Sequence, residues 1–243
     1  MSEMKKKILI TGATGNLGEA IAATMSAHAS HLCLNFKSSH RKVEELARSL
    51  AVRGGRVDAF AQDLATPRGP ENLIEHAMHV MDGIDVLINL ASSFEKAALA
   101  STDEEGWQRI VDTNLRAPFF LAKATAMAME RDGGSMIFFS DTAAARPYGD
   151  YLPYCMAKAG VETMVKGLAR TLAPKIRVNA IAPYIVSKPD DMSEKGWQDL
   201  IDKTPSRRPT EPHEIASLVK WLAMDAETTT GQVITLDGGR LLR

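Results

Sequence analysis

Residues 8–18 read ILITGATGNLG, and this stretch decides the fold class of the chain. Its first residues form a short apolar run that ends at a turn, which is typical of a strand buried on both faces of a sheet. A helical pattern follows the glycines and continues through Ile21 and Met25. A strand, a glycine-rich turn and a helix in this order are the context of a dinucleotide-binding fingerprint, in which backbone N–H groups at the helix N-terminus hold a pyrophosphate. The alternative is an ordinary glycine-rich turn.

Apolar strand-like runs and helical patterns alternate along the rest of the chain. The strand-like runs lie at residues 8–11, 31–36, 57–61, 84–90, 136–139, 176–181 and 233–236. This alternation predicts a single α/β domain over residues 1–243, with a Rossmann-type doubly wound parallel sheet of about seven strands and helices on both faces.

Prolines and capping residues predict where the helices begin. The pair Thr-Pro at 66–67 is expected to supply the N-cap and first turn of one helix, and residues 102–105 are expected to form a capping box that opens another. Pro118 predicts a kink just after Asn114. The polar stretch 187–209 contains three prolines and is expected to form a lid-like loop rather than core.

The bulk composition excludes several classes of partner. The chain has 29 basic and 30 acidic residues, well mixed, so we expect no nucleic-acid partner and no membrane surface. Cys33 and Cys155 are too few for a disulfide framework, which fits a reducing compartment. The apolar run after residues 5–7 is too short for a signal peptide, and no run approaches the roughly 18 apolar residues of a membrane span. We therefore expect a soluble, cytoplasmic protein with a small-molecule substrate and no bound metal.

Tyr154 and Lys158 lie four residues apart, about one turn on the same face of an expected helix. A phenol with an ordinary pKa of about 10 is a weak acid, and a neighbouring ammonium favours the phenolate and lowers that pKa. Asp141 lies 13 residues before Tyr154 at an expected strand end, and Asn114 lies between it and the glycine-rich turn. Together these residues favour a dinucleotide-dependent reductase over an ordinary pair on a helix face.

The end of the second expected strand predicts the choice of cofactor. In a protein that binds NAD, an acidic residue about 20 positions after the glycines holds the ribose. Here the region offers Lys37, Ser38 and Ser39, and the first acid is Glu44. Cations and hydroxyls suit a 2′-phosphate, so we predict NADP(H) rather than NAD, with a solvated basic turn as the alternative.

With these residues in place, the whole chain resembles the short-chain dehydrogenase/reductase family. Thr11, Gly12 and Gly18 resemble its cofactor turn, Asp63 its adenine contact, and residues 85–89 its fourth strand. Asn114, Tyr154 and Lys158 fall on its catalytic Asn, Tyr and Lys. The resemblance implies a homotetramer that uses the two long helices. It also implies cofactor contacts from Gly12, Thr14, Asn16, Leu17, Lys37, Ser38, Ser39, Asp63, Leu64, Asn89, Ala91, Tyr154, Lys158 and Pro183.

The chain departs from the main pattern of that family at several positions. Asn16 stands at a turn position that is usually Gly, residues 89–92 read NLAS instead of NNAG, and Tyr184 replaces the usual Gly after Pro183. Asp141 occupies the position of the catalytic Ser.

Pteridine reductases and dihydromonapterin reductases also carry an Asp at the position of Asp141. They resemble this chain again at residues 91–94, which read ASSF, and at residues 190–192, which read DDM. The Arg that these reductases often carry in the turn is Asn16 here. The resemblance implies that Phe94 stacks on a pterin, and it implies substrate contacts from Ser92, Phe94, Asp141, Tyr154 and Tyr184.

The expected reaction is hydride transfer from NADPH to a C=N bond of a pterin. Tyr154 would donate the proton, Lys158 would hold the nicotinamide ribose, and Asn114 would order a water in a relay to Lys158. Asp141 would orient the Tyr154 hydroxyl and accept a hydrogen bond from a substrate N–H; Ser140 could instead take the usual Ser role. The alternatives are a carbonyl reductase, for instance of 3-oxoacyl thioesters, and a scaffold that binds NADP without turnover.

Overall fold

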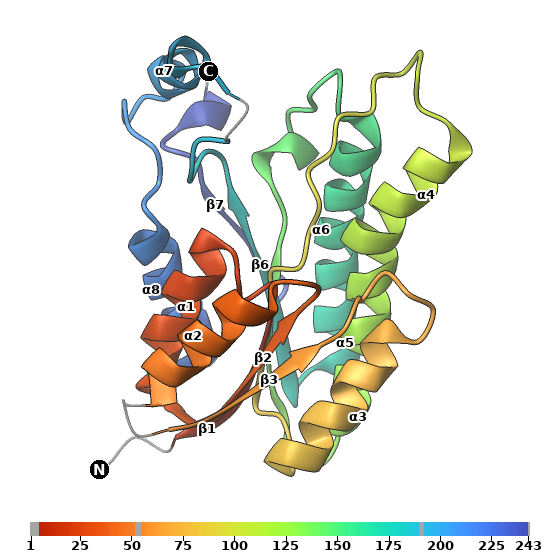
Figure 1. Cartoon of the computed structure of the whole chain (residues 1–243), viewed down its shortest axis with the longest axis vertical. Helices are drawn as coiled ribbons and strands as arrows, with labels where there is room; N and C mark the ends of the chain where they lie inside the picture. The colour runs from red at the N-terminus through yellow and green to blue at the C-terminus, as the bar shows by residue number, and fades with distance from the viewer. Residues whose placement is uncertain (1–4, 52–54, 190–191, 243) are drawn as a thin grey trace.

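Seven parallel strands run through the middle of the computed structural model, which describes residues 5–51, 55–189 and 192–242 (Figure 1). Their order in the sheet is β3-β2-β1-β4-β5-β6-β7, and every neighbouring pair is parallel. The strands are β1 (Lys6–Thr11), β2 (Ala29–Phe36), β3 (Arg56–Ala61), β4 (Val86–Asn89), β5 (Gly134–Phe139), β6 (Ile176–Pro183) and β7 (Val233–Leu236). This confirms the predicted doubly wound parallel sheet.

Helices cover both faces of the sheet (Figure 1). One layer contains α1 (Asn16–Ser26), α2 (His40–Ala51) and α8 (Pro212–Met224). The other contains α3 (Gly69–Met81), α4 (Glu104–Val111), α5 (Ala117–Ala128) and α6 (Leu152–Leu172). Each layer has its own apolar core, and successive residues of β1 face them in turn: Ile8 and Ile10 pack with α1 and α8, whereas Leu9 packs with the opposite layer. This alternation is the pleat of a strand buried on both sides.

The order of the strands reverses between β1 and β4. In the register of these strands, Thr11 pairs with Asn89, so the glycine-rich turn after β1 lies beside residues 90–91 after β4. A crevice at such a switch point, outside the carboxyl ends of the strands, is where open α/β sheets bind ligands.

The predicted lid contains a helix. α7 (Glu194–Asp202) begins after Ser193, whose Oγ accepts a hydrogen bond from the Gly196 N–H at 3.1 Å. The expectation of a loop over residues 187–209 was therefore wrong for its middle part. Residues 190–191, which carried part of the resemblance to pteridine reductases, lie outside the described residues.

Two predicted N-caps are displaced. α3 begins at Gly69, and Thr66 Oγ1 instead donates to the Asp63 carbonyl at 2.8 Å. α4 is capped by Asp103, which accepts from the Gly106 N–H at 2.8 Å. Thr102, the predicted cap of α4, likewise donates from Oγ1 to the Ala98 carbonyl at 2.8 Å, and such side-chain bonds to a nearby loop compete with the cap.

The kink predicted from Pro118 is a π-helical turn, η1 (Asp112–Arg116). The Ala117 N–H bonds to the Asp112 carbonyl five residues back, which widens the helix just before the proline. Such π-turns are frequent at functional sites, and this one contains the buried Asn114. Within the described residues, none of the helices combines the length and apolarity needed to span a bilayer.

The turn after β1 gives a test of the fold with a built-in control. A Cβ on Gly18 would overlap the Gly12 carbonyl oxygen and lie 2.8 Å from the Ala13 carbonyl carbon, whereas a Cβ on Gly15 would come no closer than 3.8 Å to Gly12 O. Gly18→Ala should therefore destabilise the protein by about 1 to 3 kcal/mol through overpacking. Gly15→Ala should change the free energy of unfolding little. Denaturant unfolding of both variants checks this, and equal midpoints would contradict it.

Candidate active site

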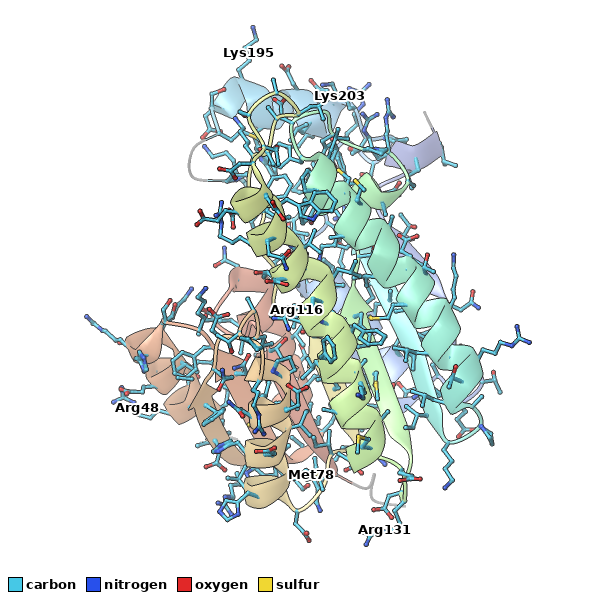
Figure 2. All side chains as sticks on the ribbon, turned by 90° about the vertical axis from the view of Figure 1, so that its right-hand side faces the viewer. Arg48, Met78, Arg116, Arg131, Lys195 and Lys203 are labelled. Atoms are coloured by element: carbon cyan, nitrogen blue, oxygen red, sulfur yellow. The ribbon has the colours of Figure 1, made fainter. Side chains whose placement is uncertain are left out.

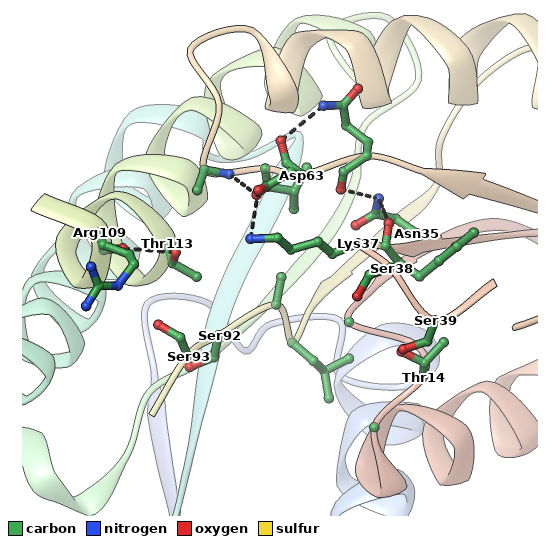
Figure 3. A pocket seen from close by; sticks show the side chains of 18 of the residues that line it. Thr14, Asn35, Lys37, Ser38, Ser39, Asp63, Ser92, Ser93, Arg109 and Thr113 are labelled. Atoms are coloured by element: carbon green, nitrogen blue, oxygen red, sulfur yellow. Dashed lines mark hydrogen bonds and ion pairs between the residues drawn. The ribbon is translucent and has the colours of Figure 1, made fainter. Parts of the chain in front are cut away.

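Two cavities open at the carboxyl edge of the sheet. The first has a volume of about 410 Å³ and lies at the switch point between β1 and β4 (Figure 3). The residues that line it are Gly12, Thr14, Gly15, Asn35, Phe36, Lys37, Ser38, Ser39, Gln62, Asp63, Leu64, Ala65, Leu90, Ala91, Ser92, Ser93, Glu95, Arg109 and Thr113.

The glycine-rich turn forms one wall of this first cavity. Gly12 has φ +65°, and a Cβ there would lie 2.9 Å from the Ala91 amide, so the turn packs directly on the end of β4. Gly15 is the N-cap of α1 and has no side chain to cover the first N–H groups of the helix. Backbone donors and the helix dipole therefore face the cavity, which fits the pyrophosphate of a dinucleotide.

An ion pair crosses the cavity at the end of β2. Lys37 Nζ lies 2.8 Å from Asp63 Oδ2, while Asp63 Oδ1 accepts from the Ala65 N–H at 2.9 Å (Figure 3). Burial raises the pKa of Asp63, but the hydrogen bonds from Lys37 and Ala65 outweigh it and hold this pKa below its ordinary value. Ser38, Ser39 and Thr14 add hydroxyl groups to the lining of the same cavity (Figure 3).

A second ion pair stands at the opposite rim. Arg109 on α4 donates from Nε to Glu95 Oε2 at 3.0 Å. The two cations that line the cavity, Lys37 and Arg109, are thus both paired with carboxylates. An anionic ligand must compete with Asp63 and Glu95 for them. Arg109 and Glu95 were missed by the sequence analysis, because only the fold brings α4 to the ends of β2 and β3.

Eight of the residues predicted to bind cofactor line the first cavity: Gly12, Thr14, Lys37, Ser38, Ser39, Asp63, Leu64 and Ala91. The other six lie elsewhere, and Tyr154 and Lys158 among them are described below with the second cavity. Asn16 is exposed, Leu17 packs against the core, and Asn89 is buried and accepts from Thr11 Oγ1 at 2.6 Å. Pro183 lines the second cavity.

The second cavity has a volume of about 450 Å³ and lies between the ends of β5 and β6 and the lid helix α7. All four tyrosines of the chain line it. The complete lining is Phe94, Asp141, Tyr148, Tyr151, Tyr154, Pro183, Tyr184, Ile185, Val186, Ser187, Pro189, Met192, Trp197 and Leu200.

Tyr154 and Asp141 meet in this cavity. The Tyr154 hydroxyl donates to Asp141 Oδ2 at 2.8 Å, and Asp141 Oδ1 accepts from the Ala143 N–H at 2.7 Å as the N-cap of a short 3₁₀ turn, η2 (Thr142–Ala144). Burial raises the pKa of Asp141 despite these hydrogen bonds. Burial and the Asp141 carboxylate together raise the pKa of Tyr154 well above its ordinary value. The phenol is therefore held in its protonated form.

Lys158 lies one helical turn away with its ammonium 5.5 Å from the centroid of the Tyr154 ring. Its Nζ donates to the Phe139 carbonyl at 2.9 Å, and burial lowers the pKa of Lys158 to about 8. The expectation that Lys158 lowers the pKa of Tyr154 is not met, because burial and Asp141 act in the opposite direction and dominate.

Ser140 turns away from the second cavity. Its hydroxyl donates to Glu162 Oε1 at 2.9 Å and approaches the Lys158 carbonyl at 3.3 Å. Asp141, rather than Ser140, is therefore the residue that contacts Tyr154.

Asn114 serves the loop after β4. Its Oδ1 accepts from Ser92 Oγ at 2.6 Å and from the Ser93 N–H at 3.2 Å, and its Nδ2 donates to the carbonyls of Ser93 and Ile110. These bonds occupy the side chain that was expected to order a water. They also explain why Ser92, predicted to contact substrate, lines the first cavity instead.

Phe94 is 52% exposed and lines the second cavity, as expected of a substrate contact. It stacks on Tyr151 with ring centroids 4.3 Å apart and meets the edge of Tyr154 at 4.9 Å. Tyr148 touches Tyr151 edge-on at 6.3 Å. The sequence analysis missed Tyr148 and Tyr151, although their spacing of three residues up to Tyr154 was a usable signal.

Tyr184 also lines the second cavity, as predicted. The guanidinium of Arg240 lies 5.6 Å from the centroid of its ring. The bulky side chain at the usual Gly position therefore forms part of the wall of the second cavity.

Comparisons with known proteins agree with this arrangement. A family model described as enoyl-(acyl carrier protein) reductase matches residues 12–240. The chain is 31% identical to the 3-oxoacyl-(acyl-carrier-protein) reductase FabG of Staphylococcus aureus, over 98% of each chain. It is similar to a solved short-chain dehydrogenase/reductase from Serratia marcescens, with a TM-score of 0.91, 26% identity and 99% of each chain covered. It is also similar to FolM alternative dihydrofolate reductase 1 from Brucella canis, solved with NADP, with a TM-score of 0.88, 27% identity, and 97% and 94% of the two chains covered.

The buried Lys158 gives a prediction for stability. The pKa of Lys158 is about 8 in the folded protein and ordinarily 10.5. The cost of burying its charge is therefore full below pH 8 and disappears as the pH rises towards 10.5. Lys158→Met should therefore stabilise the protein at pH 7 by about 1 to 3 kcal/mol while abolishing activity, and the gain should shrink across that pH window. The exposed Lys166→Met on the same helix is the control. Thermal unfolding checks this; a gain that is absent at pH 7, or equal in both variants, would contradict it.

Proposed function

The chain belongs to the short-chain dehydrogenase/reductase family of nicotinamide-dependent oxidoreductases, and we propose that it uses NADPH to reduce a C=N bond in a pterin-type ring. The observation that carries this proposal is the hydrogen bond from Tyr154 to Asp141 in a cavity lined by aromatic side chains. In this hydrogen bond Tyr154 would be the proton donor of the reaction, and Asp141 would accept hydrogen bonds from N–H groups of the substrate.

Asp141 favours a nitrogen heterocycle over a ketone. A ketone oxygen accepts hydrogen bonds, and a carboxylate beside it supplies no donor and disfavours the negative charge that develops there. A pterin ring offers N–H donors that a carboxylate can accept. The exposed ring of Phe94 adds a flat apolar surface at the same place.

The protonation states support reduction. When bound, the nicotinamide supplies the hydride. Tyr154 holds its proton firmly because of burial and Asp141, and it can deliver that proton to a substrate nitrogen that becomes basic. Lys158, charged below pH 8, lies close enough to Tyr154 to stabilise the phenolate that remains, and it would hold the nicotinamide ribose. We propose that Asn114 acts by holding the loop of Ser92 and Ser93 in place.

The end of β2 supports NADPH as the cofactor. Lys37, Ser38 and Ser39 line the first cavity and can contact a 2′-phosphate once Lys37 leaves Asp63. Asp63 would then be free to accept from the adenine amino group. The similar FolM protein is described as complexed with NADP.

A second candidate function is the reduction of a 3-oxoacyl thioester. The similarity to FabG favours it, because that relative is named a 3-oxoacyl-(acyl-carrier-protein) reductase. Asp141 and the aromatic cavity weigh against it. The remaining alternative is a scaffold that binds NADPH without turnover. It is disfavoured because the Tyr154–Lys158 pair would then serve no reaction.

We further propose that the protein is a cytoplasmic homotetramer. Figure 2 shows α5 and α6 side by side on one face of the molecule. Phe119 and Met127 on α5 and Met156 on α6 are between 46% and 71% exposed, and an interface between copies would cover them. The free thiols of Cys33 and Cys155 fit a reducing compartment.

The substrate is tested by changing the acceptor. Asp141→Ser should lower kcat/KM for a dihydropterin by more than about tenfold, or 1.4 kcal/mol, while leaving any ketone reduction unchanged or raised. Asp150→Ser, at an exposed loop position nearby, is the control and should behave like the unmodified protein. A loss of equal size for pterin and ketone would refute the role of Asp141 as a pterin acceptor.

The cofactor choice is tested at Lys37. We expect the unmodified protein to prefer NADPH over NADH by at least about tenfold in kcat/KM, and Lys37→Ala to remove most of that preference because a charge-assisted contact to phosphate is lost. Lys42→Ala is the matched control, since Lys42 pairs with Glu19 at 2.9 Å outside the cavity. If Lys37→Ala weakens NADPH and NADH equally, Lys37 does not recognise the 2′-phosphate.

A further inference from the structure

We propose that the second cavity selects substrates whose side chain carries no negative charge. This inference rests on the proposed function. For a pterin substrate it means that a free pterin is preferred over a pterin conjugated to an acidic tail. Among the described residues that line the cavity, Asp141 is the one carboxylate, and none is Lys, Arg or His. The remaining lining consists of tyrosines, Phe94, Trp197 and aliphatic or small side chains. The cavity therefore offers an anion no counter-charge.

Three of the cations near this cavity, Lys158, Lys188 and Arg240, are not among the residues that line it. Lys158 donates to the Phe139 carbonyl. Lys188, between two lining residues, forms an ion pair with Glu194. The guanidinium of Arg240 lies 5.6 Å from the centroid of the Tyr184 ring.

The two walls of the cavity are apolar over most of their extent. On one side Tyr154, Phe94, Tyr151 and Tyr148 form a continuous series of ring contacts. On the other side the lid contributes Met192 with Trp197 and Leu200 of α7, whose apolar side chains are half-buried and face the cavity. No residue of α7 is fully buried, and Trp197 and Leu200 are the residues of this helix that line the cavity.

An anionic tail would lose solvation between these walls. Burying a carboxylate without a partner costs several kcal/mol, and the charge of Asp141 adds repulsion. A neutral polyol or alkyl side chain avoids both costs, because the phenol hydroxyls of the tyrosines can hydrogen-bond to a polyol. The charge of the side chain, more than its size, is therefore the property that the cavity distinguishes.

The test compares kcat/KM for two dihydropterins with NADPH: one with a neutral polyhydroxyalkyl side chain, and dihydrofolate, which ends in a glutamate. We expect the neutral substrate to be preferred by at least about tenfold, equivalent to 1.4 kcal/mol. Leu200→Lys should shift this ratio towards dihydrofolate. Lys195→Ala, on the same helix but pointing away from the molecule (Figure 2), should leave the ratio unchanged.

Equal kcat/KM for the two substrates would overturn the proposal, and loss of dihydrofolate reduction in Arg240→Gln would then identify Arg240 as the counter-charge. If neither pterin is reduced, the proposed function has failed, and the charge preference is measured on ethyl acetoacetate against acetoacetate. A preference for the ester supports the inference for a carbonyl substrate, whereas equal use of the ester and the acid overturns it.

Discussion

The hydrogen bond from the Tyr154 hydroxyl to Asp141 connects the fold to the chemistry of this protein. Asp141 follows β5 and caps the η2 turn, whereas Tyr154 lies in the first turn of α6, so the bond ties the end of the sheet to the longest helix. Because both groups are buried, the carboxylate raises the pKa of the phenol and keeps its proton in place. In the proposed reaction this single contact would position the proton donor, keep it protonated and present an acceptor to the substrate. The hydrogen bond between Tyr154 and Asp141 lies in the wall of the aromatic second cavity, so a substrate bound in that cavity would lie beside it.

The cofactor cavity follows a different principle. Its backbone donors are fixed by close packing of Gly12 on Ala91, but its two cations are paired with Asp63 and Glu95. A phosphate group that binds Lys37 or Arg109 must first displace the paired carboxylate. This exchange lowers the net binding free energy of each phosphate contact and makes binding sensitive to salt. Discrimination between NADPH and NADH then depends on how much better Lys37 binds a phosphate than it binds Asp63. The second cavity, by contrast, is lined by one carboxylate and by no cation among the described residues, so the two neighbouring cavities differ in the charges that line them.

Much of the fold could be predicted because burial on both faces leaves a strong pattern in the sequence. The run at Ile8–Ile10 and the glycines after it are sufficient to indicate the first strand, turn and helix. The N-caps of α3 and α4 are displaced because Thr66 and Thr102 donate hydrogen bonds to carbonyl groups of the preceding loops, and helix propensity alone does not predict those bonds. The direction of the pKa shift of Tyr154 could not be predicted, since spacing along a helix shows that Lys158 is near but not that burial and Asp141 outweigh it. Tyr148, Tyr151 and Arg109 were missed because loops and crossovers bring them to the cavities.

The central claim is that Asp141 and Tyr154 serve a pterin-type substrate in a family that also contains ketone reductases. The most direct test gives the unmodified protein NADPH with either a dihydropterin or a 3-oxoacyl thioester and follows the loss of NADPH absorbance. We expect oxidation of NADPH that depends on the dihydropterin, with a kcat/KM at least about tenfold above that for the thioester. Brisk reduction of the thioester with no reaction of the dihydropterin would contradict the claim, and Phe94 would then be a packing partner of Tyr151 rather than a substrate contact.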